Sequence, residues 1–209
     1  ASIGYEGTVN LADGLTLTVD GTGTCPKMAG IYENGFESLY RSYGRGSLNT
    51  GKPANLTYNL GDNTTITMHG QDIAEQEPDI FSQYVYYSQT GIINDGGIMN
   101  AGDNLNITSD VQGIYTLNAS GINNTKYGQM HIGDNAVIKA SGTLAKLSSG
   151  YGAELYGIIS RHNHVWEDES TNKGRQVIAL GKNAEITVDF NSRGTVTESP
   201  SSIMGAAIR

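Results

Sequence analysis

The chain has 209 residues, 13 basic and 21 acidic, which gives a formal net charge of −8. So few cations offer little to nucleic-acid phosphates or anionic lipids, and no window approaches the roughly 20 apolar residues of a membrane span, so neither nucleic-acid binding nor membrane insertion of this segment is expected. The lone Cys25 excludes an internal disulfide and a cysteine-based zinc site.

Five segments share one pattern, in which two short alternating stretches flank a turn of Gly, Asp or Lys, and Asn. In chain order they are residues 9–19, 58–68, 99–109, 130–140 and 178–188. Gly and Asn tolerate the positive φ of a sharp bend, and period-two alternation indicates half-buried strands. The first copy is degenerate, with Ala12 at the Gly position and Gly14 at the Asn position. The repeat predicts a recurring strand-turn-strand corner.

Aligning the copies predicts two columns of side chains after the corner. The inward column is Leu17, Ile66, Ile107, Ile138 and Ile186. The outward column is Thr18, Thr67, Thr108, Lys139 and Thr187. Because β-branched polar residues suit the solvent side of a sheet, the second column is expected to be exposed.

A weaker Gly-Ile motif alternates with the corners along the chain. We place its copies at residues 28–31, 89–92, 111–114, 155–158 and 203–206. The shortest unit then predicts three strands per turn, at residues 103–109, 111–117 and 127–132. The corners, at positions 12, 61, 102, 133 and 181, are unevenly spaced, which excludes solenoids of fixed repeat length and favours constant strands joined by variable loops.

The sequence therefore predicts an all-β fold, a single-stranded right-handed parallel β-helix of about five three-stranded turns, each stacked on its neighbours. An antiparallel sandwich with Gly-rich turns is the alternative, and it leaves the recurring corner unexplained. We expect residues 1–209 to form one β-helix segment. Because the pattern starts at residue 9 and runs to Arg209 without polar caps, we expect it to come from a longer chain.

The Gly-Asp-Asn corners followed by Ile, the Thr-rich outer columns and the Gly-Ile strands resemble the passenger domains of bacterial autotransporter adhesins, which use type V secretion. Two-partner-secretion haemagglutinins, phage tailspikes and β-helix polysaccharide enzymes share parts of these motifs. The resemblance implies a Gram-negative origin and a secreted protein held at the cell surface by a C-terminal outer-membrane barrel outside this sequence. It implies adhesion to a host surface glycan or protein, or homotypic contacts between bacteria.

Insertions carry function on solenoids. Here they are predicted at residues 32–53, 69–82, 141–151 and 160–174. Tyr40 and Tyr43 are candidates for a partner contact, or else form a small loop core. Tyr84 and Tyr86 share one face of an expected strand and either stack on sugar rings or pack inside. Trp166 is a candidate binding contact or a loop anchor.

Two stretches of the insertions carry metal-binding residue types. Oxygen ligands for calcium occur at Asp72, Glu75, Glu77 and Asp79. Their spacing matches no known calcium loop, so a solvated acidic loop is the favoured interpretation. His162 and His164 share one side of an extended segment near Glu167 and Asp168, which suits a metal site or, as we favour, a polar loop. We predict no metal site and no cofactor.

A β-helix polysaccharide lyase or glycoside hydrolase is the alternative function. A glycosidase needs paired carboxylates at a fixed gap, and the outward strand positions offer only Lys139 and Glu185 as charged groups. The chain also lacks a Ser-His-Asp arrangement with a supporting motif. The enzyme hypothesis therefore depends on loop residues, namely Glu75, Glu77, Asp79, His162 and His164. We predict no catalytic residue and a protein that is not an enzyme.

Overall fold

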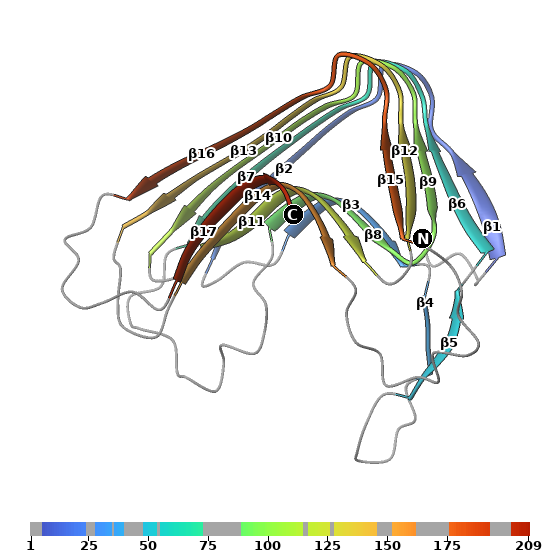
Figure 1. The fold of residues 1–209 in the computed structure, drawn as a ribbon, viewed down its shortest axis with the longest axis horizontal. Helices are drawn as coiled ribbons and strands as arrows, with labels where there is room; N and C mark the ends of the chain where they lie inside the picture. The colour runs from blue at the N-terminus through green and yellow to red at the C-terminus, as the bar shows by residue number, and fades with distance from the viewer. Residues whose placement is uncertain are drawn as a thin grey trace.

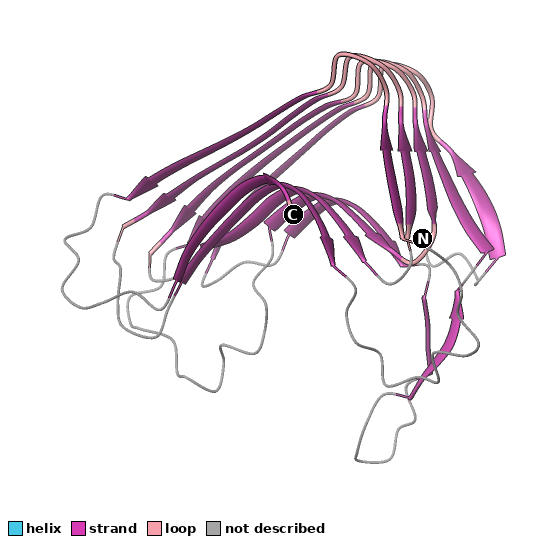
Figure 2. Cartoon of the chain, in the orientation of Figure 1, coloured by secondary structure: helices cyan, strands magenta, loops and turns pink. Residues whose placement is uncertain are grey.

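A computed structural model gives the fold of most of the chain. It describes residues 6–23, 28–34, 36–39, 48–53, 55–72, 89–114, 117–125, 128–145, 152–161, 176–192 and 202–209. These residues form strands and their short connections (Figure 2). Since none of the described residues is helical, this part of the chain holds no helix with the length and apolarity needed to cross a membrane.

Three parallel five-stranded sheets, named A, B and C here, form the body of the molecule (Figure 1). Sheet A contains β1 (Glu6–Asn10), β6 (Asn55–Leu60), β9 (Ile98–Ala101), β12 (Gln129–Ile132) and β15 (Val177–Leu180). Sheet B contains β2 (Thr16–Gly23), β7 (Thr65–Asp72), β10 (Asn106–Gly113), β13 (Val137–Leu144) and β16 (Glu185–Ser192). Sheet C contains β3 (Met28–Asn34), β8 (Gln89–Asp95), β11 (Leu117–Thr125), β14 (Gly152–Arg161) and β17 (Ser202–Ile208).

Each turn of the chain adds one strand to sheet A, then one to B, then one to C. Neighbours in a sheet therefore come from consecutive turns and run parallel. In Figure 1, where the C-terminal turn lies nearest the reader, the chain runs counter-clockwise from sheet A through B to C, so the coil is right-handed. The predicted parallel β-helix of five three-stranded turns is confirmed, and the antiparallel sandwich is wrong for the body of the molecule.

The predicted corner joins sheet A to sheet B in every turn, and it reads Gly-Asp-Asn in the three central turns. Its Asn residues adopt the left-handed conformation at Asn63, Asn104, Asn135 and Asn183, with φ between 58° and 60°. Gly14 takes the same place in the first turn with φ of 70°. The predicted turn chemistry is thus confirmed, because Asn and Gly are the residues that reach this conformation at low cost.

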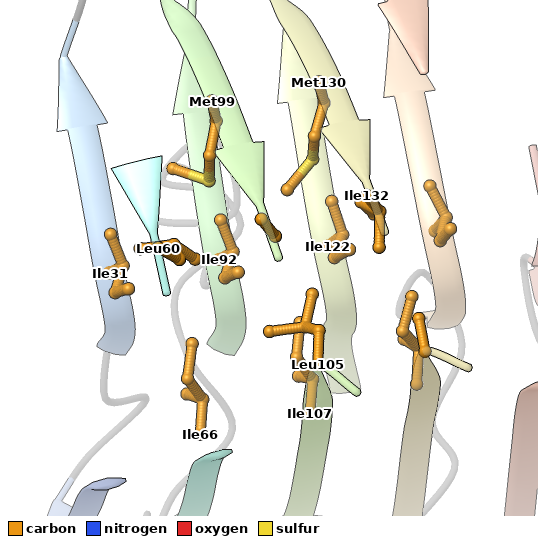
Figure 3. Packing of buried hydrophobic residues seen from close by; sticks show 14 residues of the cluster. Ile31, Leu60, Ile66, Ile92, Met99, Leu105, Ile107, Ile122, Met130 and Ile132 are labelled. Carbon is orange, nitrogen blue, oxygen red and sulfur yellow. The ribbon is translucent and has the colours of Figure 1, made fainter. Parts of the chain in front are cut away.

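The two predicted columns of sheet B are confirmed by its register, which pairs each member with the same position of the next turn. In the inward column Ile66, Ile107 and Ile138 are fully buried, whereas Leu17 and Ile186 in the end turns are only partly buried. Figure 3 shows Ile66 and Ile107 of this column beside Ile92 and Ile122 of sheet C, with Met99 and Met130 of sheet A in the same cluster.

The Gly-Ile motif is confirmed at residues 28–31, 89–92 and 155–158, but its other two predicted copies are wrong. Ile122 pairs with Ile92 and Ile158, so the third copy is residues 119–122, and residues 111–113 belong to β10 in sheet B. The predicted strands 103–109 and 111–117 are therefore displaced. The fifth copy is also shifted, because Ile208 pairs with Ile158.

The predicted insertions begin too early, because the regular alternation of four strands continues into them. The strands concerned end at Asn34, Asp72, Leu144 and Arg161. The first insertion also contains an antiparallel pair, β4 (Phe36–Leu39) with β5 (Leu48–Pro53). Long connections therefore occur only at the two ends of sheet C, while the corner from sheet A to sheet B keeps a constant length.

Candidate interaction surface

The predicted binding residues lie outside the described part of the chain. They are Tyr40, Tyr43, Tyr84, Tyr86 and Trp166. The loop residues considered for metal or catalysis also lie there, namely Glu75, Glu77, Asp79, His162, His164, Glu167 and Asp168. The strands fix only where their segments attach, which is between β4 and β5, between β7 and β8, and between β14 and β15. The second and third of these connections begin or end at a strand of sheet C, whereas the first lies within the antiparallel pair of β4 and β5, which follows β3 of sheet C.

Asp72, the one member of the proposed acidic loop that the structure describes, is the last residue of β7. It is 6% exposed, and its Oδ2 accepts the backbone N–H of Ile114 at 3.5 Å. A buried carboxylate bonded to the backbone of the next turn is part of the coil. The interpretation of Asp72 as part of a solvated loop is therefore wrong.

Sheet C offers little exposed surface in its middle turns. Thr90 and Ser120 are buried and hydrogen-bonded through their hydroxyl oxygens at 3.0 Å, and Tyr156, the next residue of that column, is buried as well. None of the three belongs to either hydrophobic core cluster. Parallel sheets are commonly covered on both sides. The central strands of sheet C are therefore a poor place for a partner.

Sheet B instead presents a row of outward side chains, which we call the polar face. Burial alternates strictly along its three central strands β7, β10 and β13, with buried residues inward and exposed or half-exposed residues outward. One of its columns is the predicted Thr column, interrupted by Lys139. The next outward column is Asp20, His69, Asp110, Ser141 and Asp189. The expectation that Lys139 and Glu185 are the only charged groups at outward strand positions is therefore wrong. Both columns consist of polar side chains that can hydrogen-bond a partner.

Three residues of the polar face, each from a different turn, form a short polar chain. Ser141 Oγ donates to Asp110 Oδ1 at 2.6 Å, and His69 Nδ1 lies 4.0 Å from Asp110 Oδ2. The order differs from that of a serine hydrolase, where the histidine stands between the serine and the carboxylate and takes the serine proton. Here Asp110 stands in the middle, so His69 is not placed to activate Ser141. The cluster can bind a polar partner without supplying a nucleophile.

The corner between sheets A and B carries a column of carboxylates at positions where the sequence predicts only turn formers. Asp13, Asp62, Asp103 and Asp134 each accept, through Oδ1, the backbone N–H of the same position in the next turn at 2.7–2.9 Å. Lys182 ends the column. Four of the five corner copies carry Asp at this position of the sequence. Their hydrogen bonds to the next turn depend on how the turns stack, which the sequence pattern does not show. One oxygen of each carboxylate is thus committed to the coil.

Asparagine amides form a second ladder beside these carboxylates. Asn104 Nδ2 donates to Asn63 Oδ1 at 3.0 Å, and the same bond links each later turn. On sheet A, Asn59 and Asn100 repeat the arrangement with Asn10, at 2.7 and 2.8 Å. These amides satisfy one another along the coil.

Within the described ranges, no three histidine, cysteine or acidic side chains come close enough to hold a metal ion. The polar face and the acidic corner are therefore the candidate interaction surface that the described strands present. A comparison with protein families, with curated proteins and with solved structures gives no match to any of them.

Proposed function

We propose that this chain is a cell-surface adhesin segment of a Gram-negative bacterium, part of a secreted passenger domain that is exported by type V secretion. In this role it attaches the cell to host cells or matrix, or links bacteria to one another. The observation that carries the proposal is the arrangement of the coil, which exposes polar columns on sheet B and adds long connections only beside sheet C.

The arrangement supports adhesion because one part of the coil is constant from turn to turn and another part varies. Stacked turns give a stiff body whose corner from sheet A to sheet B is constant, and variable segments attach at the two ends of sheet C. Loops held on a rigid scaffold are where binding residues concentrate. Many copies displayed on one cell turn weak single contacts into strong attachment through avidity.

The partner that we propose is a host surface glycan or protein, or a second copy of the chain. Tyr40, Tyr43, Tyr84, Tyr86 and Trp166 stay our predicted contacts, since tyrosine and tryptophan are the residues enriched where proteins bind sugars and each other. Thr67 and Thr108 of the polar face add hydrogen-bonding groups at a regular spacing.

A glycan array probed with the purified chain, together with an aggregation assay on cells that display it, tests this proposal. We expect binding or aggregation that is lost in a Tyr40→Ala/Tyr43→Ala or a Trp166→Ala variant. A His131→Ala variant on the exposed side of β12 in sheet A, outside the polar face, serves as the folded control. Turnover of a polysaccharide panel, detected as new reducing ends or unsaturated products, would overturn the proposal in favour of an enzyme. The proposal would also be overturned if neither the glycan array nor the aggregation assay detected any binding.

A further inference from the structure

Three strands of sheet B repeat one short pattern on the polar face, a threonine followed two residues later by an aspartate. The copies are Thr18-Val-Asp20 on β2, Thr108-Ser-Asp110 on β10 and Thr187-Val-Asp189 on β16. Residues two apart on a strand point to the same side, so each threonine lies beside its aspartate. The two strands between them, β7 and β13, carry His69 and Ser141 at the aspartate position. The Thr-x-Asp pair therefore recurs at every second turn.

The three carboxylates of this pattern face solvent. Asp20 and Asp189 are exposed, and the side chain of Asp110 is 46% exposed even though Ser141 donates to its Oδ1. The register of sheet B keeps all three in one column along the coil axis. A partner that lies along this axis can therefore reach each of them in turn.

The column fixes the distance between the carboxylates. Neighbouring strands of a sheet lie about 4.8 Å apart, so side chains two turns apart in one column are separated by about 9.5 Å. The strands that separate Asp20 from Asp110 and Asp110 from Asp189 are β7 and β13. Cationic groups on a partner pair with all three carboxylates only if they repeat at nearly the same distance.

A polyproline II segment has this repeat. Its chain rises about 3.1 Å per residue with about three residues per turn, so every third side chain lies on one face at intervals of about 9.3 Å. Side chains on one face of a β-strand are about 6.8 Å apart, which does not match. Seven residues of an α-helix advance about 10.5 Å, so a mismatch accumulates from one carboxylate to the next.

The threonines suit the backbone of such a segment. A polyproline II chain makes no internal hydrogen bonds, and its carbonyl groups stay available to a partner. A threonine hydroxyl can donate to a carbonyl and accept from an N–H. Thr18, Thr108 and Thr187 each stand next to a carboxylate, so one strand offers a group for the partner's side chain and a group for its backbone.

The other charged side chains of the polar face follow the same alternation. Lys139 stands on β13, whose aspartate position is occupied by Ser141, so the cation lies in a turn without a carboxylate in this column. Glu185 on β16 is exposed and adds a negative charge beside the third Thr-x-Asp pair. Lys139 repels an approaching cation, while the carboxylates attract it.

We propose that the Thr-x-Asp column binds an extended polyproline II segment of a partner protein that carries Lys or Arg at every third position. The segment lies along the coil axis, each of its cations pairs with one carboxylate, and the threonines bond its backbone. The inference rests on the proposed function insofar as it takes the polar face as an interaction surface, and it names the chemistry of a protein partner.

Two synthetic peptides of identical composition test the proposal. One repeats the triplet Pro-Pro-Lys, and the other holds the same residues with its lysines irregularly spaced. Their affinities for the purified chain are measured by fluorescence anisotropy at low and at physiological salt. We expect the triplet peptide to bind about tenfold more tightly, because three exposed ion pairs form with it at once. Salt should reduce this preference, since the charges are exposed.

Variants assign the preference to the column. Asp20→Asn/Asp110→Asn/Asp189→Asn removes the three charges but keeps oxygen acceptors, and it should bind both peptides equally. Lys139→Gln should bind the triplet peptide more tightly than the wild type does.

A charge-matched control separates the column from the overall charge of the chain. Glu75→Gln/Glu77→Gln/Asp79→Asn changes the net charge by the same amount outside the strands of sheet B, and it should keep the preference. If circular dichroism shows the triple Asp variant to be unfolded, Asp20→Asn/Asp189→Asn, which leaves the bond from Ser141 to Asp110 in place, must reduce the preference.

Equal affinity of the wild-type chain for the two peptides would overturn the inference, as would an equal loss of preference in the column variant and its charge-matched control. The outcome is independent of the proposed function. Binding on the glycan array or cell aggregation without a preference for the triplet peptide would remove only this inference. A preference for the triplet peptide without either of those activities would remove only the adhesin proposal.

Discussion

The carboxylate oxygen Oδ1 of Asp62 accepts the backbone N–H of Asp103 at 2.8 Å, across 41 positions of sequence. The same bond joins Asp13 to Asp62 and Asp103 to Asp134. The corner is therefore held by bonds that run along the coil axis, from a side chain in one turn to the backbone of the next. This relationship makes an exposed acidic residue part of the structure.

Replacing Asp62 with alanine should lower the stability of the coil. The Asp103 N–H loses its partner, and because the corner is exposed to water the expected cost is about 1 kcal/mol of unfolding free energy. Asp62→Asn keeps an oxygen acceptor and removes one of several stacked negative charges, so it should cost less than alanine. Urea unfolding of the three proteins measures both differences. Equal losses of unfolding free energy in Asp62→Ala and Asp62→Asn would show that the Asp62 oxygen does not stabilise the corner as an acceptor.

Gly121→Ala should be one of the most harmful small substitutions in the chain. The new Cβ would overlap Ile138 Cγ2 and lie 2.7 Å from the backbone oxygen of Gly157, both of which belong to the packed interior. Overpacking of this kind costs about 1–3 kcal/mol. Gly23→Ala is the matched control, since an added Cβ there meets nothing within 4 Å. We expect the control to unfold at nearly the wild-type midpoint, and a comparable loss in both variants would contradict the packing argument.

Removal of one methylene from the isoleucine column should cost more in the middle of the coil than at its end. Ile107 is fully buried, whereas Ile186 occupies the same column in the last turn and is only partly buried. Ile107→Val is expected to lower the unfolding free energy by about 1 kcal/mol, and Ile186→Val by less. Denaturant titration of the two variants side by side measures the difference. If Ile186→Val lowered the unfolding free energy more than Ile107→Val does, the last turn would be better packed than the exposure of Ile186 indicates.

Asn124 should be sensitive to loss of its side-chain donor. It is fully buried, and its Nδ2 donates to the backbone oxygens of Gly128 at 2.9 Å and Val177 at 3.3 Å. Asn124→Leu keeps the branched shape of the side chain, with bulkier methyl groups, but leaves both carbonyls without this donor, which we expect to cost about 2 kcal/mol. The exposed Asn106→Ala on β10 should change stability by less than about 0.5 kcal/mol. Thermal unfolding of both variants tests the contrast, and a tolerated Asn124→Leu would rule out this role.

The parts of the fold that depend on local chemistry can be predicted from the sequence. Asn63 and Asn104 predict a left-handed turn, because asparagine adopts that backbone conformation at low cost. The period-two alternation after each turn predicts that Ile66 and Ile107 point inward. The Gly-Ile motif was harder to place, because glycine has no side chain to mark a face. Gly113 at the end of β10 was therefore mistaken for the inward glycine of sheet C, which is Gly121.

The polar contacts between turns could not be predicted, because they depend on the register of distant segments. His69, Asp110 and Ser141 come from β7, β10 and β13, and nothing local connects them. The axial bond from Asp62 to Asp103 is invisible for the same reason, since Asp is also an ordinary turn residue. Loop lengths vary between the copies, so only the stacked structure brings these groups together.

The parallel stacking of the turns also determines how the coil would respond to mechanical load. The backbone hydrogen bonds of all three sheets join one turn to the next and run along the coil axis. A force pulling the first and last turns apart loads every junction between turns, so the least well-packed junction yields first, and the side chains of the end turns are only partly buried. The coil should yield to tension by peeling from an end, while it resists bending through three sheets at once.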